Sequence, residues 1–372
     1  MGDGELHGSD AIATVEERRD ALVGRLFEAT LGAMDLYGVY LGDRLRLYRA
    51  LADAGPLTAG GLAEAAGIHP RYAREWLEQQ AATGILEVDN AEADAKERRF
   101  SIPAGHDEAL LEETSLNYAA PFGMVFAGAV RPLDELLGAF RSGDGVPYEH
   151  YGADLYEGQE AFTRPMFTHL LGGEWLPAVS DVHERLLVEP RARIADVACG
   201  CGWSSIGIAR AYPLVQVDGV DLDTASIEKA RKNLAGTDVA DRVTFHERDA
   251  ADPALAGKYD LVTIFEALHD MSYPVEVLRA LRGMLVEGGS VIVGDELTED
   301  SFQAPAGDLE RFYYGFSILH CLPVGMVGDN PAGTGTVMRT DTVRGYAEEA
   351  GFTGFEVLPI ENDFWRFYRL TP

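Results

Sequence analysis

The sequence predicts an α/β protein with a doubly wound, seven-stranded sheet that ends in an antiparallel hairpin, preceded by a mainly α-helical domain. From residue 193 onward, short apolar runs alternate with amphipathic helical stretches, which is the pattern of a parallel sheet with right-handed crossovers. The last two apolar runs are separated by a short polar turn instead of a helix, so they can pair only as an antiparallel hairpin. Before residue 193 the apolar residues recur at helical spacing.

The predicted strands of the sheet span residues 194–198, 215–222, 243–247, 259–265, 290–294, 355–358 and 364–370. The predicted helices span residues 203–211, 224–234, 274–285 and 341–350. The chain has 372 residues, 47% of them hydrophobic, which suffices for one large domain and a smaller companion.

The N-terminal part predicts a winged-helix unit. Residues 15–51 carry apolar side chains at steps of three and four, and two shorter helices follow at 58–66 and 70–83 with Gly67 in the turn between them. Residues 85–88 and 99–102 can pair as a two-stranded wing. Residues 55–103 contain five basic residues against eight acidic ones, and a DNA reader needs a basic face. We therefore expect a packing or dimerisation module.

These patterns divide the chain into four parts: a flexible tail (1–14), the winged-helix domain (15–103), a helical connector and substrate lid (104–187) and the α/β domain (188–372). The formal net charge of -30 makes nucleic acid an unfavourable partner for the whole chain. No apolar run approaches the ~18 residues of a membrane helix, and no signal peptide is evident. We expect a soluble, cytoplasmic protein whose three cysteines, Cys199, Cys201 and Cys321, are reduced thiols.

The stretch ADVACGCGWSS, residues 195–205, lies between the first predicted strand and its helix. In a doubly wound sheet a ligand binds over the carboxyl ends of the strands. Gly200 and Gly202 allow the backbone to approach such a ligand. Asp221, at the end of the second strand, can accept both hydroxyls of a ribose. Asp249, after the third strand, can receive an adenine amino group.

Two residues of this stretch argue against a dinucleotide. Ser205 occupies the position where the dinucleotide fingerprint requires a third glycine or alanine. Asp196 places a carboxylate where a pyrophosphate would lie and would repel it. A cofactor with a sulfonium and an amino group suits this site better, and that cofactor is S-adenosylmethionine (SAM).

Asp196-x-Ala198-x-Gly200-x-Gly202, together with Asp221 and the closing hairpin, resembles class I SAM-dependent methyltransferases with a Rossmann-like sheet. The winged-helix unit in front resembles the small-molecule O-methyltransferase type, whose N-terminal domain dimerises, so a homodimer is expected. The resemblance implies that Asp221 holds the ribose, that Leu222 packs on the adenine, and that Asp249 and Ala250 contact the base. The backbone of residues 198–202 would face the methionine part. Ala198 stands where the family has its first loop glycine.

The fourth strand ends in IFEALHDMSYP, so Glu266, His269 and Asp270 emerge beside the expected cofactor methyl group. We count Glu266 with the cofactor-binding residues. A histidine is a suitable base for a phenol or an enol, and LHDM resembles the stretch that carries the catalytic histidine in small-molecule O-methyltransferases. Met271 replaces the tryptophan of that stretch. The first hypothesis is therefore methyl transfer to a small aromatic or enolic metabolite, with His269 as general base.

A second histidine leaves alternatives open. Residues 309–325 predict a helix that places His320 on the same face as Leu309, Phe312, Tyr313 and Phe316. His320 could then join His269 and Asp270 as catalytic residues or as ligands of iron or another divalent metal. That arrangement resembles metal-dependent 2-oxo-acid C-methyltransferases. A third hypothesis is a SAM-binding regulator that reads DNA through its winged helix.

Overall fold

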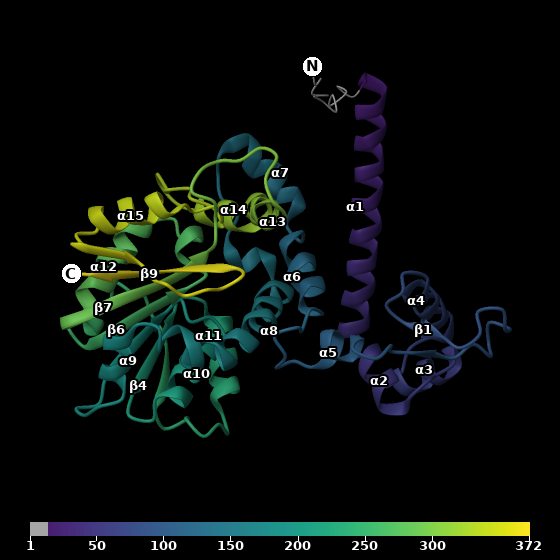
Figure 1. The fold of residues 1–372 in the computed structure, drawn as a ribbon, viewed down its shortest axis with the longest axis horizontal. Coiled ribbons are helices and arrows are strands. Elements are labelled where there is room, and N and C mark those ends of the chain that lie inside the picture. The colour runs from purple at the N-terminus through teal and green to yellow at the C-terminus, as the bar shows by residue number, and fades with distance from the viewer. Residues whose placement is uncertain (1–13) are drawn as a thin grey trace, which may run out of the picture. The chain divides into compact units, whose positions relative to one another are not determined.

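The computed structural model describes residues 14–372 and divides the chain into two compact units, which meet between Leu111 and Glu112 (Figure 1). The predicted tail lies, apart from Thr14, outside the described residues. The first unit extends eight residues past the predicted boundary at residue 103, because helix α5 (His106–Leu111) belongs to it. Leu110 packs into the core of this unit, and Arg49 donates a hydrogen bond to the carbonyl of Leu111. The connector forms one unit with the α/β domain.

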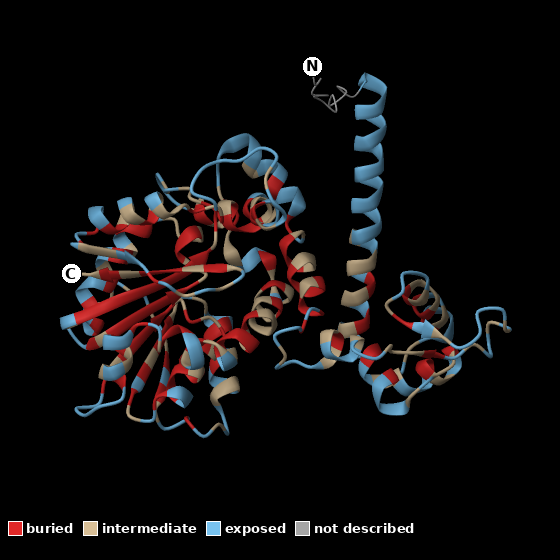
Figure 2. Cartoon of the chain, viewed as in Figure 1, coloured by how far each residue is buried: buried red, intermediate tan, exposed pale blue. Residues whose placement is uncertain are grey.

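The first unit has the predicted winged-helix order of elements. It contains α1 (Val15–Arg44), α2 (Leu47–Ala54), α3 (Ala59–Ala66), α4 (Pro70–Ala82), the two-stranded wing of β1 (Glu87–Val88) and β2 (Phe100–Ser101), and α5. Residues 15–51, where the sequence pattern is helical, fall in two helices, because the chain turns at Arg46, whose φ of 58° is left-handed. Gly67, at φ 67°, ends α3 and makes the predicted turn. Figure 2 shows that α1 is exposed over most of its length.

The second unit contains the seven-stranded sheet, in the order β5-β4-β3-β6-β7-β9-β8. Its strands are β3 (Arg193–Val197), β4 (Gln216–Asp221), β5 (Val243–Glu247), β6 (Tyr259–Phe265), β7 (Leu285–Glu296), β8 (Gly354–Val357) and β9 (Trp365–Thr371). Strands β3 to β7 are parallel, and β9 runs antiparallel to both β7 and β8. The predicted doubly wound sheet with a C-terminal hairpin is confirmed.

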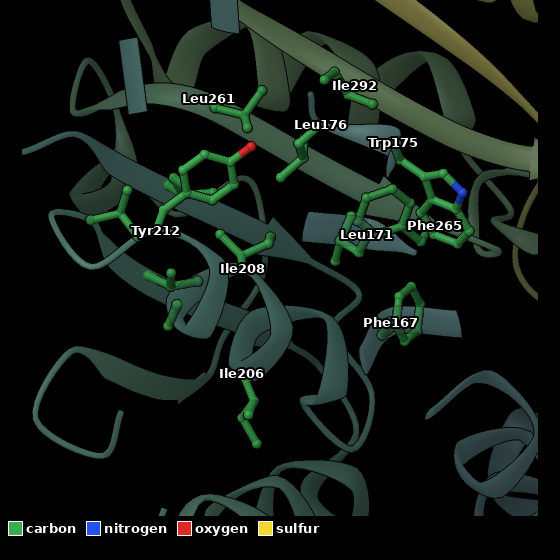
Figure 3. Close-up of a cluster of buried hydrophobic side chains, with 14 of the residues drawn as sticks. Phe167, Leu171, Trp175, Leu176, Ile206, Ile208, Tyr212, Leu261, Phe265 and Ile292 are labelled. Carbon is green, nitrogen blue, oxygen red and sulfur yellow. The ribbon is translucent and has the colours of Figure 1, made fainter. Parts of the chain in front are cut away.

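Helices cover both faces of this sheet. On one face lie α9 (Ser180–Leu186), α10 (Trp203–Ala211) and α11 (Thr224–Leu234), and on the other lie α12 (Pro274–Met284) and α15 (Thr340–Glu349). Alternate residues of each strand enter the two cores, as Leu261 and Val262 of β6 do. Figure 3 shows the first core, where Trp175 lies beside Phe265 with 6.4 Å between their ring centroids. These cores hold the carboxyl ends of the strands in place.

The connector is helical, as predicted. It contains α6 (Pro121–Ala129), α7 (Leu133–Ser142), the short turn η1 (Tyr148–Tyr151), α8 (Ala153–His169) and the π-helical turn η2 (Leu171–Trp175). Helix α8 packs against α6 and α10. Its Gly158 permits this contact, because a Cβ atom there would lie 2.7 Å from the backbone nitrogen of Val125. Among the helices of residues 14–372, none combines the length and the apolar character that a membrane crossing requires.

Candidate functional site

In the loop between β3 and α10, every second residue from 198 to 202 has a left-handed backbone conformation. Ala198, Gly200 and Gly202 have φ angles of 53°, 49° and 85°, a region that side-chain-bearing residues seldom adopt. The motif therefore has small residues at positions 198, 200 and 202 because the backbone is left-handed at each of them. Gly202 is also constrained by packing, because an added Cβ would lie 2.3 Å from Cζ of Phe245. The loop ends directly at the N-terminus of α10, whose free N–H groups favour a ligand with acceptor atoms.

Asp221 is aimed at this loop from the end of β4. One carboxylate oxygen accepts the N–H of Gly200 at 2.8 Å, and the other accepts the N–H of Asp223 at 2.9 Å. Burial raises the pKa of Asp221 despite these backbone hydrogen bonds. Each oxygen retains a lone pair for a further donor. The carboxylate thus lies next to the glycine loop with capacity for a ligand's hydroxyl groups.

Asp196 has a different position from the one its sequence pattern suggested. Its side chain is 1% exposed and lies beneath the loop. It accepts hydrogen bonds from the hydroxyls of Ser204 at 2.5 Å, Ser205 at 2.6 Å and Thr263 at 2.9 Å. Burial raises its pKa, and the three hydroxyls act in the opposite direction. Asp196 therefore joins β3, α10 and β6, and Ser205, which counted only as a departure from the dinucleotide pattern, has a structural role.

The residues expected around an adenine lie at the ends of β4 and β5. Leu222 is 70% exposed, which is unusual for a leucine and leaves its side chain available for contact. Asp249 accepts the N–H of Ala251 at 2.8 Å, and Ala250 packs against the core on the α12 side of the sheet. These residues and Asp221 belong to neighbouring strand ends, as the sequence predicted.

Glu160 of α8 is a residue of the site that was not predicted from the sequence. Its side chain is 10% exposed and lies beside the loop. One carboxylate oxygen accepts the indole N–H of Trp203 at 2.8 Å and the amide of Asn233 at 2.6 Å. The other lies 3.6 Å from the ammonium of Lys229. Glu160 therefore connects the connector to α10 and α11. Nothing in the local sequence indicated this, because its partners are 43 and 73 residues away.

The part of the site beside the expected cofactor methyl group, called here the transferring end, lies at the carboxyl ends of β6 and β7. His269 is in the short turn η4 (Leu268–Asp270) and is 2% exposed. Its Nδ1 lies 2.8 Å from a carboxylate oxygen of Asp295, the penultimate residue of β7. Burial alone would lower the pKa of His269, but Asp295 and Cys321 raise it well above its usual value. The imidazole is thus oriented by Asp295, and the thiol of Cys321 is a second neighbour of its ring.

Three more carboxyl groups surround this histidine. Glu266 follows β6 at a φ of 52° and donates its N–H to the carbonyl of Gly294 at 2.8 Å, which puts it beside Asp295 and Glu296. Burial, opposed by His269, raises the pKa of Glu266 to about 7 and that of Asp270 to about 6. Glu296 is 6% exposed, and burial together with Glu266 raises its pKa well above the usual value.

His320 is buried within a π-helical turn. After α13 (Asp308–Phe316) the chain makes this turn, η5 (Ser317–Cys321), before α14 (Leu322–Gly325). A π-helical turn contains one more residue than an α-helical turn, so the segment is not the single regular helix that the sequence predicts. The His320 ring contacts those of Tyr148 and Tyr151, with centroids 5.8 and 4.6 Å away. Burial lowers its pKa to about 3, so it is a neutral imidazole.

The predicted set of His269, Asp270 and His320 stays a prediction, and the structure adds a related group of potential ligands. Within residues 14–372, the potential metal ligands whose donor atoms all lie within 4.8 Å of one another are His269, Asp270 and Cys321. Cys321, which sequence analysis treated as inert, is next to His320, with its sulfur 3.5 Å from Nδ1. Burial raises the pKa of this thiol.

A cavity of about 480 Å³ lies at the same edge of the sheet but away from the glycine loop. It is lined by Leu170, Leu297, Val357, Leu358, Ile360, Glu361, Asn362, Asp363, Trp365 and Arg366. Leu297 directly follows Glu296, and Trp365 is the cross-strand partner of Glu296. The cavity therefore borders the strand end that carries the carboxyl cluster.

Comparison with known proteins agrees with this geometry. Residues 195–291, which extend from β3 into β7, match the family described as a methyltransferase domain. The second unit contains a methyltransferase domain. Residues 33–111 match the Rv2258c-like winged HTH domain, which confirms the winged-helix prediction. The whole fold resembles that of small-molecule O-methyltransferases.

The chain is similar in sequence to the 27-O-demethylrifamycin SV methyltransferase of Amycolatopsis mediterranei. The identity is 33% over 120 residues, which is 32% of this chain and 44% of that protein, so the match spans less than half of the relative. Human N-acetylserotonin methyltransferase, solved in complex with SAM, covers 97% of this chain and 99% of its own at a TM-score of 0.70 and 16% identity. The mitomycin 7-O-methyltransferase MmcR covers 95% of this chain and 98% of its own, with a TM-score of 0.68 and 19% sequence identity. These two structures share the fold.

Proposed function

We propose that the protein is a SAM-dependent O-methyltransferase that acts on a small aromatic or enolic metabolite, with His269 as general base. The observation that carries the proposal is the left-handed loop of residues 198–202 with Asp221 aimed at it, within a methyltransferase domain. Leu222, Asp249 and Ala250 would complete the adenosine site. Asp196 would act by holding the loop from beneath.

The cofactor assignment is supported by the chemistry of the loop. A carboxylate at the end of β4 accepts ribose hydroxyls, and Asp221 lies there with a lone pair free on each oxygen. The structural relative solved with SAM has the same fold. Glu266, next to His269, would face the sulfonium.

Transfer to oxygen is supported by His269 and by the names of the relatives, two of which are O-methyltransferases. Methyl transfer is an in-line displacement, so the protein mainly positions the acceptor and removes its proton. His269 Nδ1 is engaged by Asp295, which leaves Nε2 as the atom that would receive the proton from the acceptor hydroxyl. The acceptor oxygen then attacks the methyl carbon, and the thioether leaves.

Calorimetry tests the cofactor assignment. SAM and its product S-adenosylhomocysteine (SAH) should each bind with one-to-one stoichiometry, and Asp221→Ala should weaken binding by about 100-fold or more, the equivalent of two lost hydrogen bonds to a charged group. The matched control is Asp241→Ala, which removes an exposed carboxylate from the same domain. A wild-type protein that binds neither compound would refute the proposal.

Turnover of a panel of phenols and enols tests the base. His269→Ala should reduce SAH formation by about 100-fold or more while its affinity for SAH stays unchanged. Unchanged turnover in this variant would remove His269 from the mechanism.

A second candidate function is metal-assisted C-methylation of a 2-oxo acid. The convergence of His269, Asp270 and Cys321 favours it, because nitrogen, oxygen and sulfur donors suit zinc or another divalent ion such as iron. A metal there would polarise the acceptor's carbonyl group. Elemental analysis of protein purified without added metal tests this. Near-stoichiometric metal that is lost in Cys321→Ala supports the set seen here, loss only in His320→Ala supports the predicted set, and active metal-free protein excludes both.

We also propose a homodimer. Leu22, Leu26 and Phe27 of α1 are 49%, 58% and 61% exposed, and light scattering should give twice the chain mass.

Binding of nucleic acid is disfavoured, because Arg71 and Arg98 of the winged-helix unit are paired with Glu75 and Glu78. Salt-sensitive binding of a DNA duplex would favour the regulator instead.

A further inference from the structure

The transferring end of the site gathers four carboxyl groups around one histidine. Glu266, Asp270, Asp295 and Glu296 converge there from the ends of β6 and β7. Asp295 and Glu296 are 1% and 6% exposed, and Glu266 and Asp270 are partly buried. Burying so many carboxyls is costly unless cations accompany them.

The protein supplies few cations to this cluster. His269 is paired with Asp295 at 2.8 Å. Arg366, opposite Asp295 on β9, is directed to the hydroxyl of Thr340 at 2.8 Å and to Asp300 at 3.6 Å. The charged groups that act most strongly on Glu266, Asp270 and Glu296 are one another, Asp295 and His269, with no lysine or arginine among them.

Two buried polar atoms at the same place have no partner among the described residues. They are the second carboxylate oxygen of Asp295 and Nε2 of His320, in side chains that are both 1% exposed. A native interior seldom leaves such atoms unpaired. Asp295 is hydrogen-bonded to His269, and His320 contacts Cys321, whose sulfur lies within 4.8 Å of the donor atoms of His269 and Asp270. Both unpaired atoms therefore belong to residues that border this site, which indicates that a polar ligand completes it.

A metal ion does not fit the whole cluster. The convergent ligand set in residues 14–372 is His269, Asp270 and Cys321, and it leaves Glu266 and Glu296 outside. The sulfonium of SAM would offset one of the carboxyls. Burial raises the pKa values of the remaining carboxyls while no cation accompanies them, and a cation would stabilise their ionised form. An organic ammonium, which hydrogen-bonds in three directions, can reach carboxyls that are too far apart to share a metal.

We infer that the acceptor carries a protonated amine, which binds among Glu266, Asp270 and Glu296 while its hydroxyl faces His269. The inference rests on the proposed function and specifies its substrate class. Nε2 of the neutral His320 completes the site as a hydrogen-bond partner of the acceptor. The cavity beside Leu297 and Trp365 gives room for the remainder of a larger amine. A carboxylate-bearing acceptor is repelled by the same groups.

A charge series on one aromatic scaffold tests this with SAH-saturated protein. Tyramine is the cation, 4-propylphenol its neutral analogue and 3-(4-hydroxyphenyl)propanoate the anion. Calorimetry should show tyramine binding at least about tenfold more tightly than the neutral analogue and the anion binding most weakly. Glu296→Gln should abolish the preference for tyramine. Glu299→Gln, which removes an exposed carboxylate three residues further along the chain, should preserve it.

The outcomes separate the two claims. A protein that fails to bind SAH refutes the proposed function before any amine is added. Normal SAH binding with equal affinity for tyramine and 4-propylphenol, or with no binding of tyramine up to about 10 mM, overturns the inference. Zinc or manganese chloride that binds stoichiometrically, is lost in Glu296→Gln and excludes tyramine would identify the cation as a metal and also overturn it. The wild-type series holds even where Glu296→Gln does not fold, and Glu266→Gln then replaces it.

Discussion

Replacing Asp196 tests whether this residue supports the loop from beneath or contacts the cofactor directly. Asp196 accepts three hydroxyl hydrogen bonds in the interior. Asp196→Ala leaves three buried hydroxyls without their acceptor, at about 1 kcal/mol each, so we expect a loss of about 3 kcal/mol in the free energy of unfolding. Asp196→Asn keeps the volume and one acceptor oxygen and relieves the burial of a charge, which already raises the pKa of Asp196. We expect it to cost about 1 kcal/mol.

Urea unfolding followed by tryptophan fluorescence measures these differences. In a Trp76→Phe background the remaining tryptophans, Trp175, Trp203 and Trp365, all belong to the second unit. With a slope of about 3 kcal/mol per M, Asp196→Ala should lower the midpoint by about 1 M. Ser204→Ala, which removes one of the three bonds, is the matched control and should shift it by about a third as much. A shift in Asp196→Ala no larger than that of the control, accompanied by a loss of SAH affinity, would refute the support role and restore direct contact with the cofactor.

Three further outcomes follow from other positions. Ala198→Gly should raise the unfolding free energy by about 1 kcal/mol and the melting temperature by about 2 °C, because it removes a left-handed alanine; an unchanged or lower melting temperature would contradict the strain. Glu160→Ala should cost about 2 kcal/mol in the urea assay, because it leaves the indole of Trp203 unpaired, and a change within the error of the assay would show that α8 is held by other contacts. Asp295→Asn should move the alkaline rise of kcat/KM to lower pH, because Asp295 raises the pKa of His269 and the base acts only when neutral; an unmoved profile would mean that another group is titrating.

The sheet could be predicted from sequence because its signals are local. Each strand from β3 to β9 is a short apolar run bounded by polar or glycine residues, and the hairpin follows from the short connection before Trp365. The glycine loop and Asp221 could be placed because the ends of parallel strands meet at one edge. Long-range partnerships could not be predicted in this way, and Glu160 is the example, since its hydrogen-bond partners are on two other helices.

The details of the transferring end depend on helix geometry that the sequence does not reveal. The prediction for His320 assumed 3.6 residues per turn throughout, whereas residues 317–321 form a π-helical turn. Cys321 thereby joins His269 and Asp270. Asp196 was assigned from charge alone, and only coordinates reveal that two serines and a threonine occupy its oxygens.

The three left-handed positions of the loop differ in what they would accept in place of glycine. At residue 200 an added Cβ meets no atom within 4 Å, whereas at residue 202 it meets Phe245. Within the protein itself the second position is therefore limited by backbone energy alone, so a bound ligand is what would exclude a side chain there. The first position tolerates the strain of a side chain, as Ala198 shows at φ 53°. The third is limited by volume, which no gain in stability elsewhere removes. The last glycine is thus the one that this protein's own packing requires, and a search pattern that insists on the first would overlook this chain.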